Sequence, residues 1–88
     1  MMKARQEVCE LILKALEGRL GLEEFYSNWP KELEGGFWDD VYDNLESAIE
    51  HFPYGIFSRM PDYEVWHNSG EYRNLLSDLN IIRRMETP

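Results

Sequence analysis

The sequence predicts an all-α fold, a four-helix antiparallel bundle with an irregular, aromatic-rich connection before the last helix. Apolar residues recur at spacings of three and four in four segments, and glycine or proline stands between these segments. The first connections are short, which favours antiparallel neighbours. Aromatic residues make up 14% of the chain and can fill the core of a single helical domain spanning residues 1–88. A three-helix core with an irregular arm is the alternative.

The first two helices are expected on either side of a glycine-containing turn. The first runs from about Lys3 to Leu16, and its broad apolar stripe is typical of a bundle core. Gly18 follows it and suits a left-handed C-terminal cap. The second helix starts near Leu22. We expect Pro30 to interrupt it and to begin a short new helical turn, because proline fits the first position of a helix.

The last two helices carry the clearest start and stop signals. The third runs from Phe37 to Phe52 and ends before Pro53, since the residue before a proline is biased away from helical geometry. The fourth runs from about Ser69 to Met85. Asn68 can cap it, with Glu71 three residues later in the spacing of a capping box.

The connection between these helices, residues 53–68, is long for so small a domain. Its alternation at Tyr63, Val65 and His67 would allow a short extended piece. Connections of this length are often functional. Two interpretations of its aromatic residues stay open: they fold back as a lid on the bundle, or they are exposed and contact a partner.

The charge of the chain is concentrated in one stretch. The formal net charge is −8, and residues 21–52 hold nine acidic side chains against one basic side chain, Lys31. The rest of the chain is balanced. Nucleic acids and anionic membranes attract lysine and arginine, so we expect neither to bind directly. A basic protein surface is the favoured partner.

Four of these carboxylates form what we call the acidic ridge: Asp39, Asp43, Glu46 and Glu50. At about 100° per residue they lie within about 60° of one another on the third helix, away from its apolar stripe. No lysine or arginine stands four residues from any of them, so their repulsion is not relieved within the helix. The ridge either keeps the protein soluble or steers a basic partner into contact.

Residues that could perform catalysis or bind metal are sparse. Neither His51 nor His67 belongs to a zinc-binding spacing, and no glycine-rich phosphate loop or calcium loop is present. The single Cys9 cannot form an intramolecular disulfide and is expected to pack in the core. We therefore expect a binding protein that is not an enzyme and uses no metal or cofactor.

No apolar run is long enough to span a bilayer, and no secretory signal is visible in the sequence. A lone cysteine fits a reducing compartment. We expect a cytoplasmic protein without a membrane anchor.

The stretch from Leu13 to Tyr26 is a helix, a glycine-containing turn and a Leu-Glu-Glu-Phe opening to the next helix. Together with Trp29 and the acidic third helix, it resembles small bacterial immunity proteins of the colicin D and contact-dependent growth-inhibition type. The resemblance covers about residues 8–52. It implies a compact helical bundle whose acidic surface plugs the basic active site of a nuclease toxin.

On that interpretation the acidic ridge supplies the charged contacts to the toxin. Exposed aromatic side chains would supply the apolar anchors that charge alone does not, and Tyr54, Tyr63 and Trp66 are the candidates. The alternative is a small regulatory or adaptor bundle in which the charge serves only solubility and the aromatic segment 53–66 could form a homodimer interface.

Overall fold

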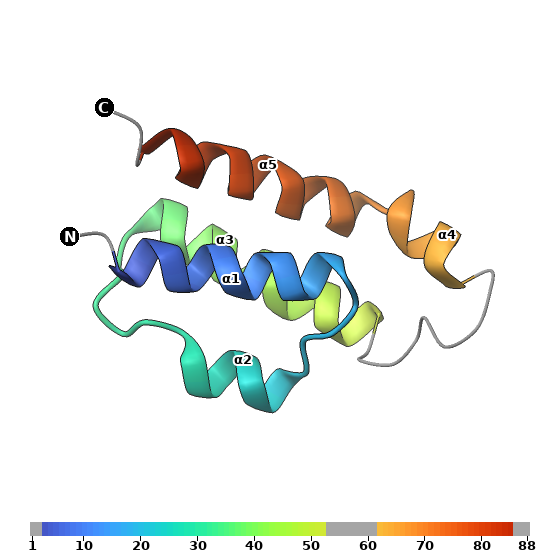
Figure 1. Ribbon diagram of the computed structural model, residues 1–88, viewed down its shortest axis with the longest axis horizontal. Coiled ribbons are helices and arrows are strands. Elements are labelled where there is room, and N and C mark those ends of the chain that lie inside the picture. Colours follow the sequence, from blue (N-terminus) through green and yellow to red (C-terminus); the bar gives the residue numbers. More distant parts are fainter. Residues whose placement is uncertain (1–2, 53–61, 86–88) are drawn as a thin grey trace.

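All regular structure in the described residues is helical. The computed structural model describes residues 3–52 and 62–85, and within these ranges it contains five helices (Figure 1). The helices are α1 (Lys3–Leu16), α2 (Leu22–Asn28), α3 (Gly36–His51), α4 (Asp62–His67) and α5 (Gly70–Met85).

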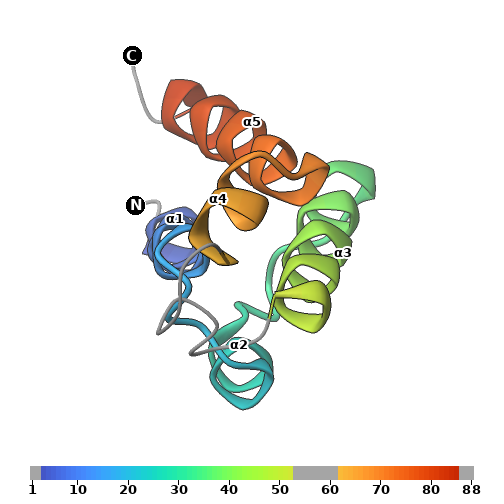
Figure 2. The same cartoon turned by 90° about the vertical axis from the view of Figure 1, so that its right-hand side faces the viewer.

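The three long helices form the body of the fold. Helices α1 and α3 run in the same direction and α5 runs back against both, while α2 and α4 are short (Figure 1). Seen along the long axis, α5 lies above α1 and α3 and contacts both, and α2 lies on the side of α1 and α3 opposite α5 (Figure 2). The all-α prediction is confirmed. The specific four-helix antiparallel bundle stays a prediction, because α2 has only seven residues and a fifth helix is present.

The core is built from one face of each helix. The radius of gyration of the molecule, 12.8 Å, is close to the ~12 Å expected for a compact domain of this length. Cys9 is half-buried at the edge of this core. The buried apolar side chains are Val8, Leu11, Ile12, Ala15, Leu20, Phe25, Val41, Leu45, Ala48, Ile49, Trp66, Leu75, Leu79 and Ile82.

The first and last helices are neighbours in space although they are farthest apart in sequence. Helices α1 and α5 pack side by side along most of their length (Figure 1). At one end of this contact the guanidinium of Arg5 donates a hydrogen bond to the backbone carbonyl of Met85 at 3.4 Å. The core is therefore closed by contacts between the two ends of the described chain.

Helix α1 ends as its sequence predicts. Gly18 has a φ of 71°, a left-handed conformation that glycine adopts without steric cost. Its N–H bonds the carbonyl of Ala15 at 2.9 Å, and the N–H of Arg19 bonds that of Lys14 at 2.9 Å. These two bonds are the Schellman motif, which satisfies carbonyls left without partners at a helix end.

The prediction of a new helical turn at Pro30 is wrong. Helix α2 ends at Asn28, and residues after Pro30 form only a turn, closed by the N–H of Leu33 on the Pro30 carbonyl at 3.4 Å. Pro30 itself is buried. A single long hydrogen bond does not propagate, because helix nucleation is unfavourable until further bonds are added.

The cap of α5 lies one residue later than predicted. The hydroxyl of Ser69, not the side chain of Asn68, accepts the N–H of Tyr72 at 3.1 Å. The amide of Asn68 instead donates to the carbonyl of Glu64 at 2.9 Å, at the end of α4. The two short polar residues therefore serve two different helix ends.

The possible extended piece near residue 65 is also wrong, because this segment is α4. In a helix Val65 and His67 fall on the outside, where Val65 is 59% exposed, while Trp66 points into the core. Burial of one large aromatic ring outweighs the weak alternation of the sequence. Tyr54 and the rest of segment 53–61 lie outside the described residues, as does the side chain of Tyr63.

Trp66 acts as a lid on the core. It is 1% exposed, and its ring contacts those of Phe52 and Tyr72 at centroid distances of 4.8 and 5.3 Å. Its indole N–H donates to the carbonyl of Leu16 at 3.0 Å and so satisfies a free carbonyl at the end of α1. The lid interpretation therefore holds for Trp66, and its expected role as an exposed anchor does not.

One carboxyl group is buried between α3 and α5. Asp78 is 8% exposed and accepts a hydrogen bond from the side-chain amide of Asn44 at 2.8 Å. Burial raises the pKa of Asp78, the charge of Asp40 raises it further, and the bond from Asn44 opposes both. Burial dominates because the ionised form loses hydration that one amide does not replace.

Replacing Asp78 with asparagine should remove a pH dependence of stability. A raised folded pKa means that Asp78 contributes stability below about pH 4, its ordinary pKa, and loses it as pH rises through the folded value. Asparagine stays neutral and can still accept the bond from Asn44. Urea unfolding from acidic to neutral pH should therefore show a smaller loss of stability in Asp78→Asn. The exposed Asp43→Asn variant removes one carboxylate in the same way and is the control for the change in net charge.

Candidate docking surface

The acidic ridge lies on one helix, α3, opposite the side that the core covers. Asp39, Asp43 and Glu50 are exposed and Glu46 is half-buried. The buried side chains of the same helix are Val41, Leu45, Ala48 and Ile49. The sixteen residues of α3 form a continuous helix, so the four carboxylates are held at fixed spacing along about three turns.

No lysine or arginine among the described side chains forms an ion pair with the ridge. The described ion pairs of lysine and arginine are Lys14 with Glu24 and Arg19 with Glu17. The ridge charges are therefore not neutralised by another described part of the fold. Such a row of like charges creates a negative potential that reaches about 8–10 Å into physiological salt solution.

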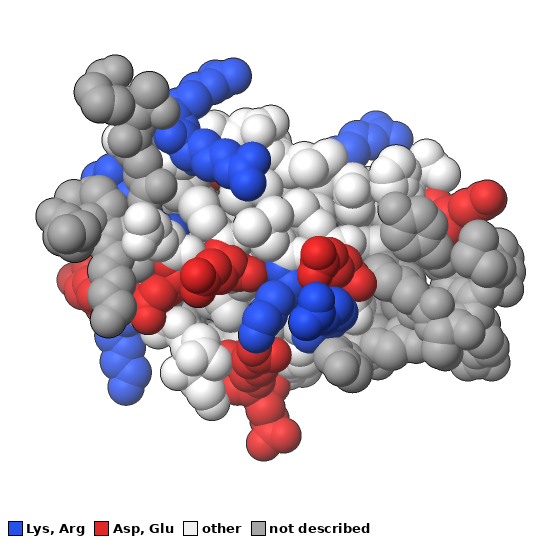
Figure 3. Space-filling view, in the orientation of Figure 1, with Lys and Arg blue, Asp and Glu red and all other residues white. Residues whose placement is uncertain are grey.

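The face around α1 is different in character. There, acidic and basic side chains occur together, and basic side chains gather where Arg83 and Arg84 end α5 (Figure 3). Mixed charge of this kind is typical of a soluble protein surface. The unmixed charge of α3 is thus a local property and not the general character of the surface.

Tyr26 is the residue of this surface that the sequence does not reveal. Its hydroxyl donates a hydrogen bond to Oε2 of Glu46 at 2.6 Å, which joins α2 to the ridge. Tyr26 is 47% exposed, although its spacing from Leu22 and Trp29 places it in an apolar helical stripe. The orientation of the short helix α2, which places Phe25 inward, leaves Tyr26 at the edge of the core.

Tyr26 packs on a cluster of three other aromatic side chains. The ring of Tyr42 is nearly parallel to that of Tyr26, with centroids 6.5 Å apart and planes at 22°. Phe25, fully buried, lies 4.8 Å from Tyr42 and 5.4 Å from Tyr26. Trp29 closes the cluster edge-on against Tyr42 at 5.2 Å. These ring contacts restrict the orientations that the Tyr26 side chain can adopt.

No protein-family model matches this chain, and no match was found among curated proteins or solved structures.

Of the three aromatic side chains predicted as partner contacts, only that of Trp66 is described, and it lies away from the ridge. Trp66 is buried at the end of the bundle between α1 and α5 and offers no surface to a partner. Tyr54 and the side chain of Tyr63 lie outside the described residues. Of the aromatic side chains that the structure describes, Tyr26 is the one that hydrogen-bonds a ridge carboxylate.

The hydrogen bond to Glu46 changes the acidity of Tyr26. Losing the phenolic proton would break this bond and place two negative charges together, which raises the pKa of Tyr26 to about 12; partial burial and the charge of Glu50 act in the same direction.

Replacing Glu46 with glutamine should lower the pKa of Tyr26 toward its ordinary value of about 10. The amide keeps an acceptor for the hydroxyl but removes the charge. Ultraviolet titration of tyrosinate should show more ionised tyrosine in Glu46→Gln than in wild type between about pH 10 and 12. Tyr26→Phe should delete the late-titrating group. Coincident titrations of wild type and Glu46→Gln would contradict the hydrogen bond.

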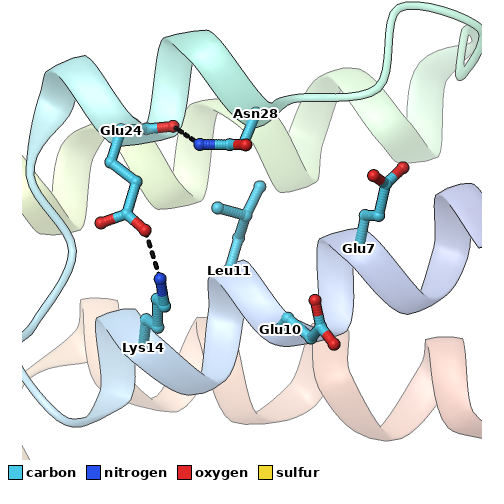
Figure 4. Close-up of a pocket in the computed structure, with 6 residues that line it drawn as sticks. All are labelled: Glu7, Glu10, Leu11, Lys14, Glu24 and Asn28. Carbon is cyan, nitrogen blue, oxygen red and sulfur yellow. Dashed lines mark hydrogen bonds and ion pairs between the residues drawn. The ribbon is translucent and has the colours of Figure 1, made fainter.

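A polar hollow of about 110 Å³ lies between α1 and α2 (Figure 4). Lys14 and Glu24 point toward each other across it as an ion pair, and Asn28 donates to the carbonyl of Glu24 at 2.8 Å. Glu7 and Glu10 project from α1 beside it. Its volume is below the ~300–1,000 Å³ of small-molecule sites. Among the described residues no group of histidine, cysteine, aspartate and glutamate side chains could hold a metal ion.

The two histidines each contact another side chain of the fold. Nδ1 of His51, at the end of α3, lies 2.6 Å from Oε2 of Glu71 in the first turn of α5. The ring of His67 packs on that of Tyr72 at 4.7 Å. Each histidine therefore contacts α5.

Within the described residues, no helix is long and apolar enough to cross a membrane.

Proposed function

We propose that this chain is a binding protein that docks on a basic protein through its acidic ridge, and that the partner is a nuclease-type bacterial toxin which it neutralises. The observation that supports the docking is the row of exposed carboxylates on α3 without a lysine or arginine partner among the described residues. The toxin as partner comes from the resemblance of residues 8–52 to small immunity proteins.

The charge pattern gives the proposal a mechanism. A nuclease active site is cationic because it holds phosphates, and a row of carboxylates offers it a competing anionic surface. The ridge also steers the approach of a basic partner and speeds association at low salt. In a cytoplasmic setting, the lone Cys9 would remain reduced.

Charge reversal on the ridge tests the proposal. We choose Asp43→Lys with Glu50→Lys, both exposed, because Glu46 is engaged by Tyr26. The matched control is Glu10→Lys with Glu64→Lys, which changes the net charge equally at exposed positions on α1 and α4. Both variants should keep the wild-type far-ultraviolet circular dichroism.

Proteins captured by the wild type and the control, but lost with the ridge variant, are then purified and assayed as nucleases. We expect a basic nuclease that the wild type inhibits at one-to-one stoichiometry and that binds the ridge variant at least about tenfold more weakly. Equal binding of both variants would remove the ridge from the interface. A captured partner without nuclease activity would overturn the toxin assignment.

The alternative, an adaptor bundle that dimerises through residues 53–66, has less support. Trp66, one of the aromatic residues that would form such an interface, is already buried within its own chain. Light scattering of the purified protein checks this alternative directly, and we expect a monomer.

A further inference from the structure

We infer that Tyr26 and Glu46 form a binding site for an arginine side chain of the partner, with the guanidinium against the tyrosine ring and on the outer oxygen of the carboxylate. This inference rests on the proposed function and specifies its chemistry. A ridge of carboxylates alone attracts any cation. An exposed ring joined to one of those carboxylates selects among cations.

One oxygen of the Glu46 carboxylate accepts a hydrogen bond within the protein, and the other accepts none from a described residue. Tyr26 donates to its Oε2, and no described residue donates a hydrogen bond to Oε1. An ionised carboxylate accepts several hydrogen bonds, so Oε1 can take an N–H from outside. Because the phenol fixes the direction of the carboxylate, a partner that binds it loses less freedom than it would at a mobile glutamate.

The side chain of Tyr26 is exposed and its ring packs on other rings. The residue is 47% exposed, and its ring lies against those of Tyr42 and Phe25, at centroid distances of 6.5 and 5.4 Å. A large exposed aromatic side chain on a packed base matches the usual anchor residues of protein interfaces. Glu50 adds a second negative charge, since its field acts on the Tyr26 phenol.

These features fit arginine better than lysine. A guanidinium is flat, so it can lie against an aromatic ring while its edge donates to a carboxylate. An ammonium is a compact, strongly hydrated charge and gains less from a ring. The charge complementarity of the ridge brings the cation to α3, and the Tyr26 ring provides the preference for arginine.

Two basic peptides of equal charge test the site: hexa-arginine and hexa-lysine, titrated at low ionic strength. Backbone amide shifts in the NMR spectrum locate the binding, and the ratio of the two dissociation constants measures the preference. A cation held against an exposed ring binds about two- to fivefold tighter than it does without the ring. Because lysine gains part of this attraction too, we expect wild type to bind hexa-arginine tighter than hexa-lysine by at most about that factor, with shifts at α2 and α3.

Two variants separate the ring from the hydroxyl. Tyr26→Phe keeps the ring and should keep the preference, whereas Tyr26→Leu should bring the ratio close to one while hexa-lysine binding changes little. An unchanged preference in Tyr26→Leu overturns the arginine site. Circular dichroism confirms the fold of both variants.

The ridge variant Asp43→Lys with Glu50→Lys tests the docking surface separately from the arginine site. If it loses both peptides while the control Glu10→Lys with Glu64→Lys retains them, the docking surface stands whatever Tyr26 does. If neither peptide binds wild type, or if both bind the ridge variant equally well, the docking surface and the arginine site fail together.

Discussion

Replacing Trp66 with alanine should remove a large part of the stability of the fold. The side chain is 1% exposed and is enclosed by Phe52, Tyr72 and the end of α1. Truncating a buried aromatic side chain costs about 3–5 kcal/mol, because apolar burial is lost and a cavity remains. A small domain has only about 5–15 kcal/mol to lose.

The loss has a second part at the helix end. The indole N–H of Trp66 satisfies the carbonyl of Leu16, and alanine leaves that carbonyl without its partner. Urea unfolding followed by circular dichroism measures the total. Trp66→Phe should lie between wild type and Trp66→Ala, since it keeps a ring but no donor. The adjacent Val65→Ala, at a 59% exposed position, should stay within about 0.5 kcal/mol of wild type. Equal stability of Trp66→Ala and Val65→Ala would show that α4 does not pack on the core.

Replacing Phe25 with alanine should have an effect of similar size and should also disturb the docking surface. Phe25 is fully buried and contacts the rings of Tyr26, Trp29 and Tyr42. The expected loss in the free energy of unfolding is about 3–5 kcal/mol. The contact joins α2 to α3, so α2 should loosen before the long helices separate.

This prediction has a local signature besides the global one. Once α2 is loose, the hydrogen bond from Tyr26 to Glu46 should weaken, and the pKa of Tyr26 should fall from about 12 toward its ordinary value. Phe25→Leu is the matched variant, because it keeps much of the apolar volume and should cost less. Native-state hydrogen exchange should show faster exchange in α2 of Phe25→Ala, with α1 and α5 less affected. Uniform acceleration in all helices would contradict a separate role for α2.

The long helices could be predicted from sequence because their signals are repeated over many residues. The apolar periodicity places α1, α3 and α5 within about one residue of their observed bounds, and Gly18 ends α1 as expected. The acidic ridge follows from the same periodicity, since a regular helix fixes which side chains share a face. Exposure of its carboxylates then depends only on which face packs.

The short elements could not be predicted because tertiary contacts decide them. Helix α4 has six residues, too few to be stable alone, and burial of Trp66 holds it in place. The choice of Ser69 over Asn68 as cap depends on the nearby end of α4, whose Glu64 carbonyl takes the Asn68 amide. The exposure of Tyr26 depends on how α2 is rotated against α3, which no local pattern encodes.

The contact between α1 and α5 bears on how the chain acquires its structure during synthesis. The bond between Arg5 and Met85 spans 80 positions, and that between Trp66 and Leu16 spans 50. Contacts between residues so far apart in sequence form only after a long loop has closed. On the ribosome, the apolar stripe of α1 therefore emerges long before α5 can cover it.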